Sequence, residues 1–195
     1  MFDIPLAYFI TFSCYGSRLH GDARGTVDRR HNRYGSQFLP FSQRWAKDSQ
    51  TRMKQPSYKL DATRRELVSR AIMEVCNKRG WRLLAAHVRT RHVHSVIASD
   101  TPPELVMIAM KASASKLLNE TGLDPPDSKR WSRHGSTAYL WKQAQLFQTI
   151  DYVVKQQGQP MSLFVEGEPA DSVGTTRTEH GGTEHGASEF VGEAD

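Results

Sequence analysis

The chain has 195 residues and a mass of 22.1 kDa, and 38% of its residues are apolar, which is enough for one packed core of ordinary size. No apolar run approaches the roughly 18 residues that span a membrane, and the N-terminus lacks the basic start and cleavage site of a secretory signal. Residues 165–195 hold eight acidic side chains and one basic one, which leaves residues 1–164 with a net charge of +12. So basic a body suggests a polyanionic partner, most commonly nucleic acid.

The composition divides the chain into a folded domain over residues 1–164 and a tail over residues 165–195. The tail is rich in Gly, Glu, Thr and Ser, and it has too few large apolar residues to offset the entropy lost on ordering, so we expect it to be disordered. Cys14 and Cys76 do not form a pair with metal-ligand spacing. We expect both to be reduced, buried thiols in a cytoplasmic protein.

The first predicted element is a buried strand over residues 7–14, a segment dense in aromatic and β-branched residues. An irregular basic insertion follows over residues 16–60, with ten Arg or Lys residues against three Asp. Asp61 is a suitable cap for a helix that runs to residue 78 or 79. Its apolar residues recur at helical spacing, and Gly80 ends it.

The remaining predicted elements are strands over 81–88 and 92–98, a helix over 101–122, a strand over 136–142 and a helix over about 145–157. Thr101 and Glu104 have the spacing of a capping box at the start of the second helix. The order β-α-β-β-α-β is that of the ferredoxin-like (RRM-like) fold, an α+β fold whose four-stranded antiparallel sheet carries two helices on one face. We expect the last helix to lie across the other face.

His92 and His94 flank a single valine on the predicted strand over residues 92–98. Side chains two residues apart on a strand point to the same face, with their Cα atoms roughly 6.5–7 Å apart. Two imidazoles at this spacing can bind one cation. Because a bare His-x-His pattern is common, two unrelated, partly exposed histidines are the alternative. We expect His87, on the preceding strand, to have a structural role.

Tyr152 and Gln156 are four residues apart on the last predicted helix, so they lie on one face of it, one turn apart. Taken alone, they fit an ordinary amphipathic helix with a half-buried tyrosine. A functional site is favoured by the combination of a two-histidine strand, a Tyr/Gln helix and a basic body in one small domain. The open face of the sheet would bring the two motifs together.

These motifs resemble those of the HUH-type single-tyrosine transposases of the smallest insertion sequences and of the related REP-associated tyrosine transposases. His92-Val93-His94 matches the His-hydrophobic-His motif of that family, and Tyr152 with Gln156 matches its helix with a tyrosine and a glutamine four residues on. The Asn-Pro found one turn after the tyrosine in many REP-associated members is replaced here by Gln156-Gln157. The resemblance covers roughly residues 5–160.

The resemblance implies a metal-dependent single-strand DNA endonuclease and strand transferase with Tyr152 as its nucleophile. Attack on a phosphodiester would give a 5′-phosphotyrosine and a free 3′-OH, and a second 3′-OH could then reverse the step and rejoin strands. His92, His94 and the Gln156 amide oxygen would hold the metal. Three neutral ligands suit Mg²⁺ or Mn²⁺, and the ligand types also allow Zn²⁺.

The implied partner is single-stranded DNA, with a hairpin near the cleavage site that is implied by the family alone. The protein would act in DNA transposition or recombination as a monomer or a homodimer, with no membrane involved. One alternative is a non-catalytic single-stranded nucleic-acid-binding module on the same fold. Another is a metal-dependent hydrolase that uses only the two histidines, which would leave Tyr152 and Gln156 without a role.

Overall fold

The computed structural model describes residues 4–17, 19 and 41–167. Its elements are, in chain order, β1 (Ala7–Cys14), α1 (Gln43–Thr51), α2 (Ala62–Arg79), β2 (Arg82–Val88), β3 (His92–Ala98), α3 (Pro103–Glu120), β4 (Trp131–Leu140), α4 (Gln143–Lys155) and β5 (Ser162–Val165). The tail from residue 168, predicted to be disordered, lies outside the described residues, as does much of the basic insertion. None of the helices described is long and apolar enough to cross a membrane.

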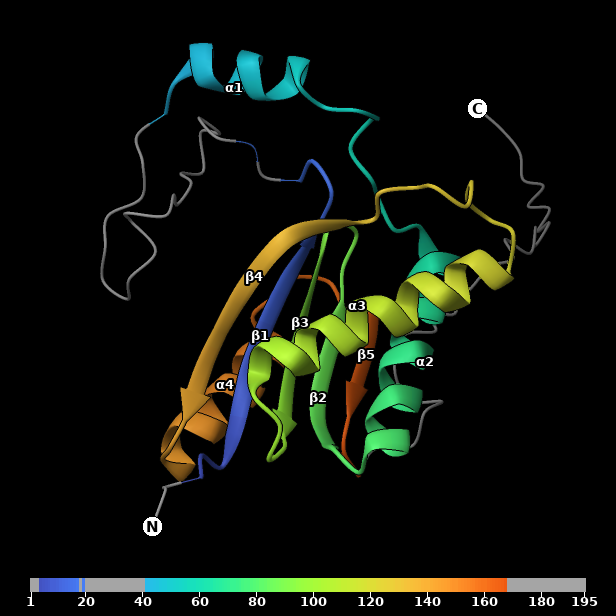
Figure 1. The fold of residues 1–195 in the computed structure, drawn as a ribbon. Helices are drawn as coiled ribbons and strands as arrows, with labels where there is room; N and C mark the ends of the chain where they lie inside the picture. Colours follow the sequence, from blue (N-terminus) through green and yellow to red (C-terminus); the bar gives the residue numbers. More distant parts are fainter. Residues whose placement is uncertain (1–3, 18, 20–40, 168–195) are drawn as a thin grey trace, which may run out of the picture.

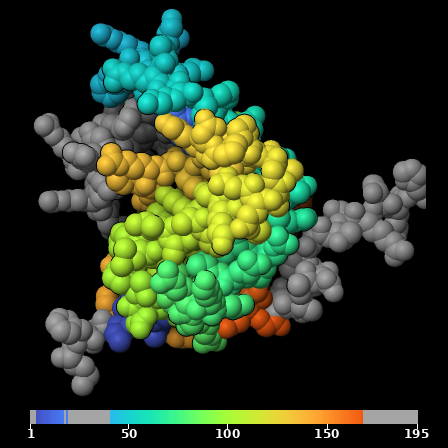
Figure 2. Space-filling model, turned by 45° about the vertical axis from the view of Figure 1, so that its right-hand side comes forward, coloured from blue at the N-terminus to red at the C-terminus, as the bar shows by residue number. Residues whose placement is uncertain are grey.

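The five strands form one antiparallel sheet in the order β4-β1-β3-β2-β5. Its first four strands have the predicted ferredoxin-like arrangement, which confirms the α+β fold class. Helices α2 and α3 lie side by side on one face of the sheet, and α4 lies behind the other (Figure 1). The space-filling view shows α2 and α3 covering their face of the sheet (Figure 2).

The fifth strand, β5, is an addition to the predicted four-stranded sheet. It pairs with β2 at the edge, so the sheet continues through Val165, one residue past the predicted domain boundary at 164. The Glu166 N–H donates to the Leu84 carbonyl at 3.0 Å, and Arg82 Nε donates to the Glu166 carboxylate at 2.7 Å. Four residues with partly buried side chains are too short a segment to give a periodic signal in the sequence.

Alternation along β1 divides its side chains between two hydrophobic clusters. Tyr8, Ile10 and Phe12 belong to the main core, which α2 and α3 cover. Ala7 and Phe9 belong to a smaller cluster beneath α4. Thr11 and Ser13 alternate with Phe9 along the strand, so they lie on the same face of the sheet as Phe9.

The two cysteines lie in the main core, as predicted. Cys14 and Cys76 are both free and fully buried. Burial raises the pKa of each thiol to about 12, and the nearby Arg91 offsets this only in part at Cys14. Both cysteines are therefore uncharged packing residues.

Local sequence signals correctly predicted the two ends of α2 but not the start of α3. Asp61 accepts a hydrogen bond from the Arg64 N–H at 2.8 Å, and Gly80 ends α2 with φ of 70°, both as predicted. The predicted capping box of α3 is wrong, because Pro102 occupies the N-cap without a side-chain bond. Thr101 instead accepts from the Trp81 indole at 3.2 Å, and Glu104 accepts from Thr137 on β4.

Two further boundaries differ from the prediction. Strand β4 begins at Trp131, five residues before the predicted start, because Trp131 pairs with Cys14 beyond an irregularity in the β1–β4 register. Helix α1, within the segment predicted to be irregular, has Ser42 as its cap. It has no buried residue and lies apart from the sheet in Figure 1, so its sequence has no core-facing stripe.

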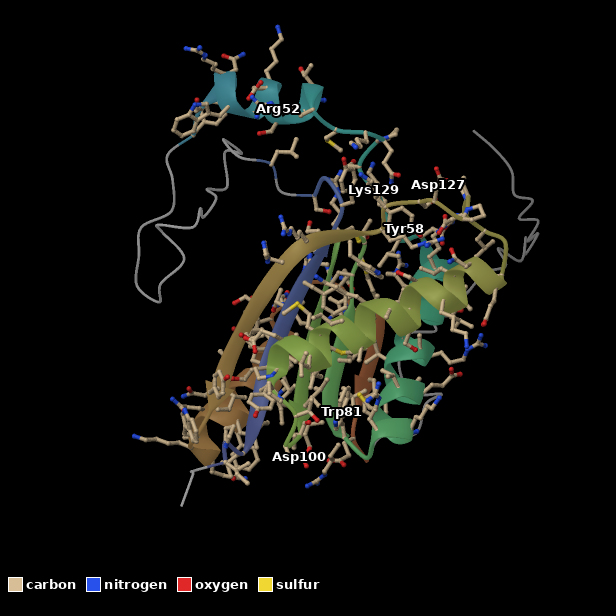
Figure 3. All side chains as sticks on the ribbon, in the orientation of Figure 1. Arg52, Tyr58, Trp81, Asp100, Asp127 and Lys129 are labelled. Carbon is tan, nitrogen blue, oxygen red and sulfur yellow. The ribbon has the colours of Figure 1, made fainter. Side chains whose placement is uncertain are left out.

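A buried carboxylate, Asp124, connects α2, the segment before it and the loop before β4. It accepts hydrogen bonds from Tyr58 at 2.5 Å, from Arg64 at 2.8 Å and from Arg130 at 2.9 Å. Figure 3 shows Tyr58 beside the loop that carries Asp127 and Lys129. Burial by itself raises the pKa of Asp124, but the three hydrogen bonds outweigh it and hold the pKa below its ordinary value.

Asp124→Asn should lower the free energy of unfolding by roughly 3–5 kcal/mol at neutral pH, because it leaves the buried Arg130 guanidinium without its counterion. The pKa of Asp124 is lower in the folded protein than in the unfolded chain, where it is about 3.9. The ionised side chain therefore stabilises the fold fully above about pH 3.9, and this stabilisation is lost as the pH falls through the pKa of the folded state. Urea unfolding at pH 7 and below pH 4 measures both effects, with the exposed Asp127→Asn as control. Equal unfolding curves for the two variants would contradict this role.

Candidate active site: a histidine and tyrosine cleft

A cleft of about 290 Å³ lies on the α4 side of the sheet. Strands β1 and β3, the turn before β3 and the C-terminal end of α4 form its walls. The residues that line it are Thr11, Ser13, Ser17, Arg91, His92, His94, Tyr152 and Gln157. Three of the four predicted site residues therefore meet in one cleft, and none of the described residues that line it is acidic.

His94 is the buried histidine of the pair, with 7% of its surface exposed. Its Nδ1 lies 2.7 Å from the Thr11 hydroxyl, and its ring stacks on Phe9 with centroids 5.5 Å apart. Burial, followed by the neighbouring His92 and His87, lowers the pKa of His94 to about 3. The ring is therefore neutral, and the Thr11 hydroxyl engages it at Nδ1.

His92 and Tyr152 complete an aromatic group around His94. The ring centroids of His92 and His94 are 4.7 Å apart, and those of His94 and Tyr152 are 5.8 Å apart. Phe9 contacts the Tyr152 ring edge-on at 6.0 Å. The Tyr152 side chain is held by these rings but remains 39% exposed, so it is accessible from solvent.

His87 fastens the end of α4 to the sheet. The Met161 N–H donates to His87 Nε2 at 3.1 Å, so the ring proton must be on Nδ1, which donates to the Val153 carbonyl at 3.0 Å. Burial lowers the pKa of His87, in agreement with a neutral ring. The predicted structural role of His87 is confirmed. Together with the fully buried Val153, His87 determines the position of Tyr152 relative to the sheet.

The structure does not bring Gln156 into the cleft. Helix α4 ends at Lys155, and the Gln156 side-chain amide donates to Asp151 at 3.2 Å on the exposed side of the helix. Gln157 lines the cleft instead, where its side chain hydrogen-bonds to His94 and donates to the Tyr152 carbonyl at 3.3 Å. The helix was predicted to run to about residue 157, but it ends two residues earlier, so the backbone at Gln156 is no longer helical and its side chain does not share the face of Tyr152.

Thr11, Ser13 and Arg91 are cleft residues that the sequence motifs did not indicate. In the antiparallel register of β1 and β3, Thr11 is opposite His94 and Ser13 is opposite His92. The two strands are about 80 residues apart in the chain, as the separation of 83 between Thr11 and His94 shows. No local pattern in the sequence indicates which residues of β1 face the histidines.

The fold of the chain is similar to that of known structures. No family model and no curated protein matches the chain. The structure of a REP-associated tyrosine transposase bound to a REP hairpin is similar over 78% of this chain and 67% of that chain, with 14% sequence identity and a TM-score of 0.42. We therefore base the proposed function on the geometry of the cleft itself.

Proposed function

We propose that this protein is a metal-dependent single-strand DNA endonuclease and strand transferase of the transposase type. The observation that carries the proposal is the meeting of His92, His94 and Tyr152 in one cleft without acidic residues. A neutral, buried His94 touches the ring of a tyrosine that solvent can reach. A tyrosine nucleophile beside two nitrogen ligands fits phosphodiester cleavage through a covalent intermediate.

In the proposed reaction the Tyr152 oxygen forms a bond to a DNA phosphorus, and the bond from that phosphorus to the 3′-oxygen breaks. The phenol proton leaves to water at the cleft mouth, and the departing 3′-oxygen takes up a proton. The products are a 5′-phosphotyrosine and a free 3′-OH. Attack by a second 3′-OH reverses these changes, releases Tyr152 and joins two strands.

The residues present fit a divalent cation, Mg²⁺ or Mn²⁺, because His94 is kept neutral and Thr11 orients its ring. A hydrogen bond to the second ring nitrogen is typical of metal-binding histidines. His92, His94 and the amide oxygen of Gln157 would hold the cation, with Gln157 taking the place assigned to Gln156. When bound, such a cation neutralises negative charge that builds up on the scissile phosphate.

The two adjacent glutamines provide a matched test of the ligand set. Gln157→Ala should weaken Mn²⁺ binding by roughly tenfold, as expected for loss of one supporting group, whereas Gln156→Ala should leave it unchanged. Isothermal titration of the full chain with Mn²⁺ measures this without any DNA. A loss confined to Gln156→Ala would instead support the i, i+4 assignment.

The experiment that tests the function uses the wild-type protein and single strands from the ends of its own locus, with and without predicted hairpins. With Mg²⁺ present, we expect a protein–DNA adduct that survives denaturing electrophoresis, and a free 3′-OH on the released strand. Tight binding without an adduct on any strand would favour the non-catalytic binding module. Light scattering of the complex would distinguish a monomer from a homodimer.

A further inference from the structure

Three arginines lie on or beside the turn between β2 and β3, and one of them, Arg91, lines the cleft. Arg89 and Arg91 lie on the turn, and Arg65 is on the first turns of α2. Arg65 donates to the Leu60 carbonyl at 3.0 Å, and the Leu60 N–H donates to the turn at Thr90. Burial and the charge of Arg65 both lower the pKa of Arg89, so these two guanidinium groups lie close enough to repel.

No carboxylate neutralises this cluster within the described residues. The ion pairs there involve other arginines and lysines, and none includes Arg65, Arg89 or Arg91. Arg65 Nε is buried without a hydrogen-bond partner. Arg89 donates to the Gln159 carbonyl at 2.5 Å and retains further N–H donors. Buried or crowded arginines are normally paired with an anion, so these side chains are suited to bind one.

Arg91 connects the cluster to the cleft. Its carbonyl accepts hydrogen bonds from the Cys14 N–H at 2.8 Å and from the Ser17 hydroxyl at 3.2 Å, which fixes its backbone. Arg91 lines the same cleft as Tyr152, and among the described lining residues it alone carries a permanent charge. The hydroxyl of Ser13, opposite His92 in the sheet, adds a neutral donor to this wall.

We propose that Arg65, Arg89 and Arg91 form a binding site for the phosphodiester backbone of single-stranded DNA beside the cleft. Arg91 would contact the phosphate nearest Tyr152, and Arg89 and Arg65 the phosphate that follows. Guanidinium forks match phosphate oxygens well, and single phosphate contacts carry no information about base sequence. The proposal rests on the proposed function, since it assigns the strand path at that cleft, but it concerns binding and not cleavage.

The test is equilibrium binding of a labelled single-stranded oligonucleotide to the full chain in a chelator, at a series of salt concentrations. Arg91→Gln should reduce the slope of log affinity against log salt by about 0.7, or about fivefold in affinity at 0.1 M salt, as for one lost phosphate contact. Arg79→Gln, at the end of α2 on the opposite face of the sheet, removes the same charge and should leave the slope unchanged. Arg91→Lys keeps the charge and should keep the slope.

Several outcomes would overturn the proposal. Equal effects of Arg91→Gln and Arg79→Gln would show attraction to overall charge only. A loss in Arg91→Lys as large as in Arg91→Gln would show a structural role. No binding of single strands by the wild type would remove the site altogether. If the wild type forms the covalent adduct while Arg91→Gln leaves the slope unchanged, this proposal fails and the proposed function stands. If Arg91→Gln lowers the slope but the wild type forms no adduct, the phosphate site stands and the proposed function fails.

Discussion

Tyr152→Phe is expected to reduce covalent adduct formation to background while leaving single-stranded DNA affinity near that of the wild type. The substitution keeps the ring and its contacts with Phe9 and His94, and it removes only the hydroxyl that would attack the phosphate. Affinity should persist because it comes mainly from phosphate contacts and stacking. Denaturing electrophoresis of labelled strands measures the adduct, and binding in a chelator measures the affinity.

Tyr139 offers a matched control for this experiment. Its ring stacks on Trp141 at 6.0 Å and meets the core residue Tyr8 edge-on at 5.1 Å, so it lies on the α2 and α3 side of the sheet, away from the cleft. Tyr139→Phe should therefore form the adduct at the wild-type level. Peptide mapping of the wild-type adduct should place the phosphate on Tyr152. A phosphate on Tyr139, or an adduct with Tyr152→Phe, would refute the assignment of the nucleophile.

The second large effect is expected for the combined variant His92→Ala and His94→Ala. Loss of both proposed nitrogen ligands should lower metal-stimulated adduct formation by roughly a hundredfold or more and should remove Mn²⁺ binding in calorimetry. Binding of single strands in a chelator should change little, because we expect the affinity to come mainly from the arginines and from stacking. The calorimetric result does not depend on activity, so it tests the metal site separately from the chemistry.

A matched control for the histidine variant is His134→Ala, since His134 is exposed on β4 and is not among the cleft residues. It should bind Mn²⁺ and form the adduct as the wild type does. A thermal melt is needed because His94 is buried and its removal leaves a void against Phe9. Wild-type rates of cleavage by a folded double variant would show that the histidines hold no essential metal.

The sequence by itself determined the elements whose signals are local. The limits of β1 and β3 agree with the prediction because β-branched residues, which favour strands, recur in both segments. The start and end of α2 follow from Asp61 and Gly80, which act within one turn of the helix. The shared strand face of His92 and His94 also follows from the period of two residues along a strand.

Only the tertiary structure decided which distant residues complete the cleft. Strand register places Thr11 opposite His94, and the end of α4 at Lys155 places Gln157 rather than Gln156 beside that histidine. The false capping box at Thr101 has the same origin, since its hydroxyl bonds to the Trp81 indole instead. The end of α4, the strand register and the added strand β5 all depend on contacts between residues far apart in the chain. The free energies of these tertiary contacts exceed the small intrinsic helix and strand propensities on which a sequence pattern depends.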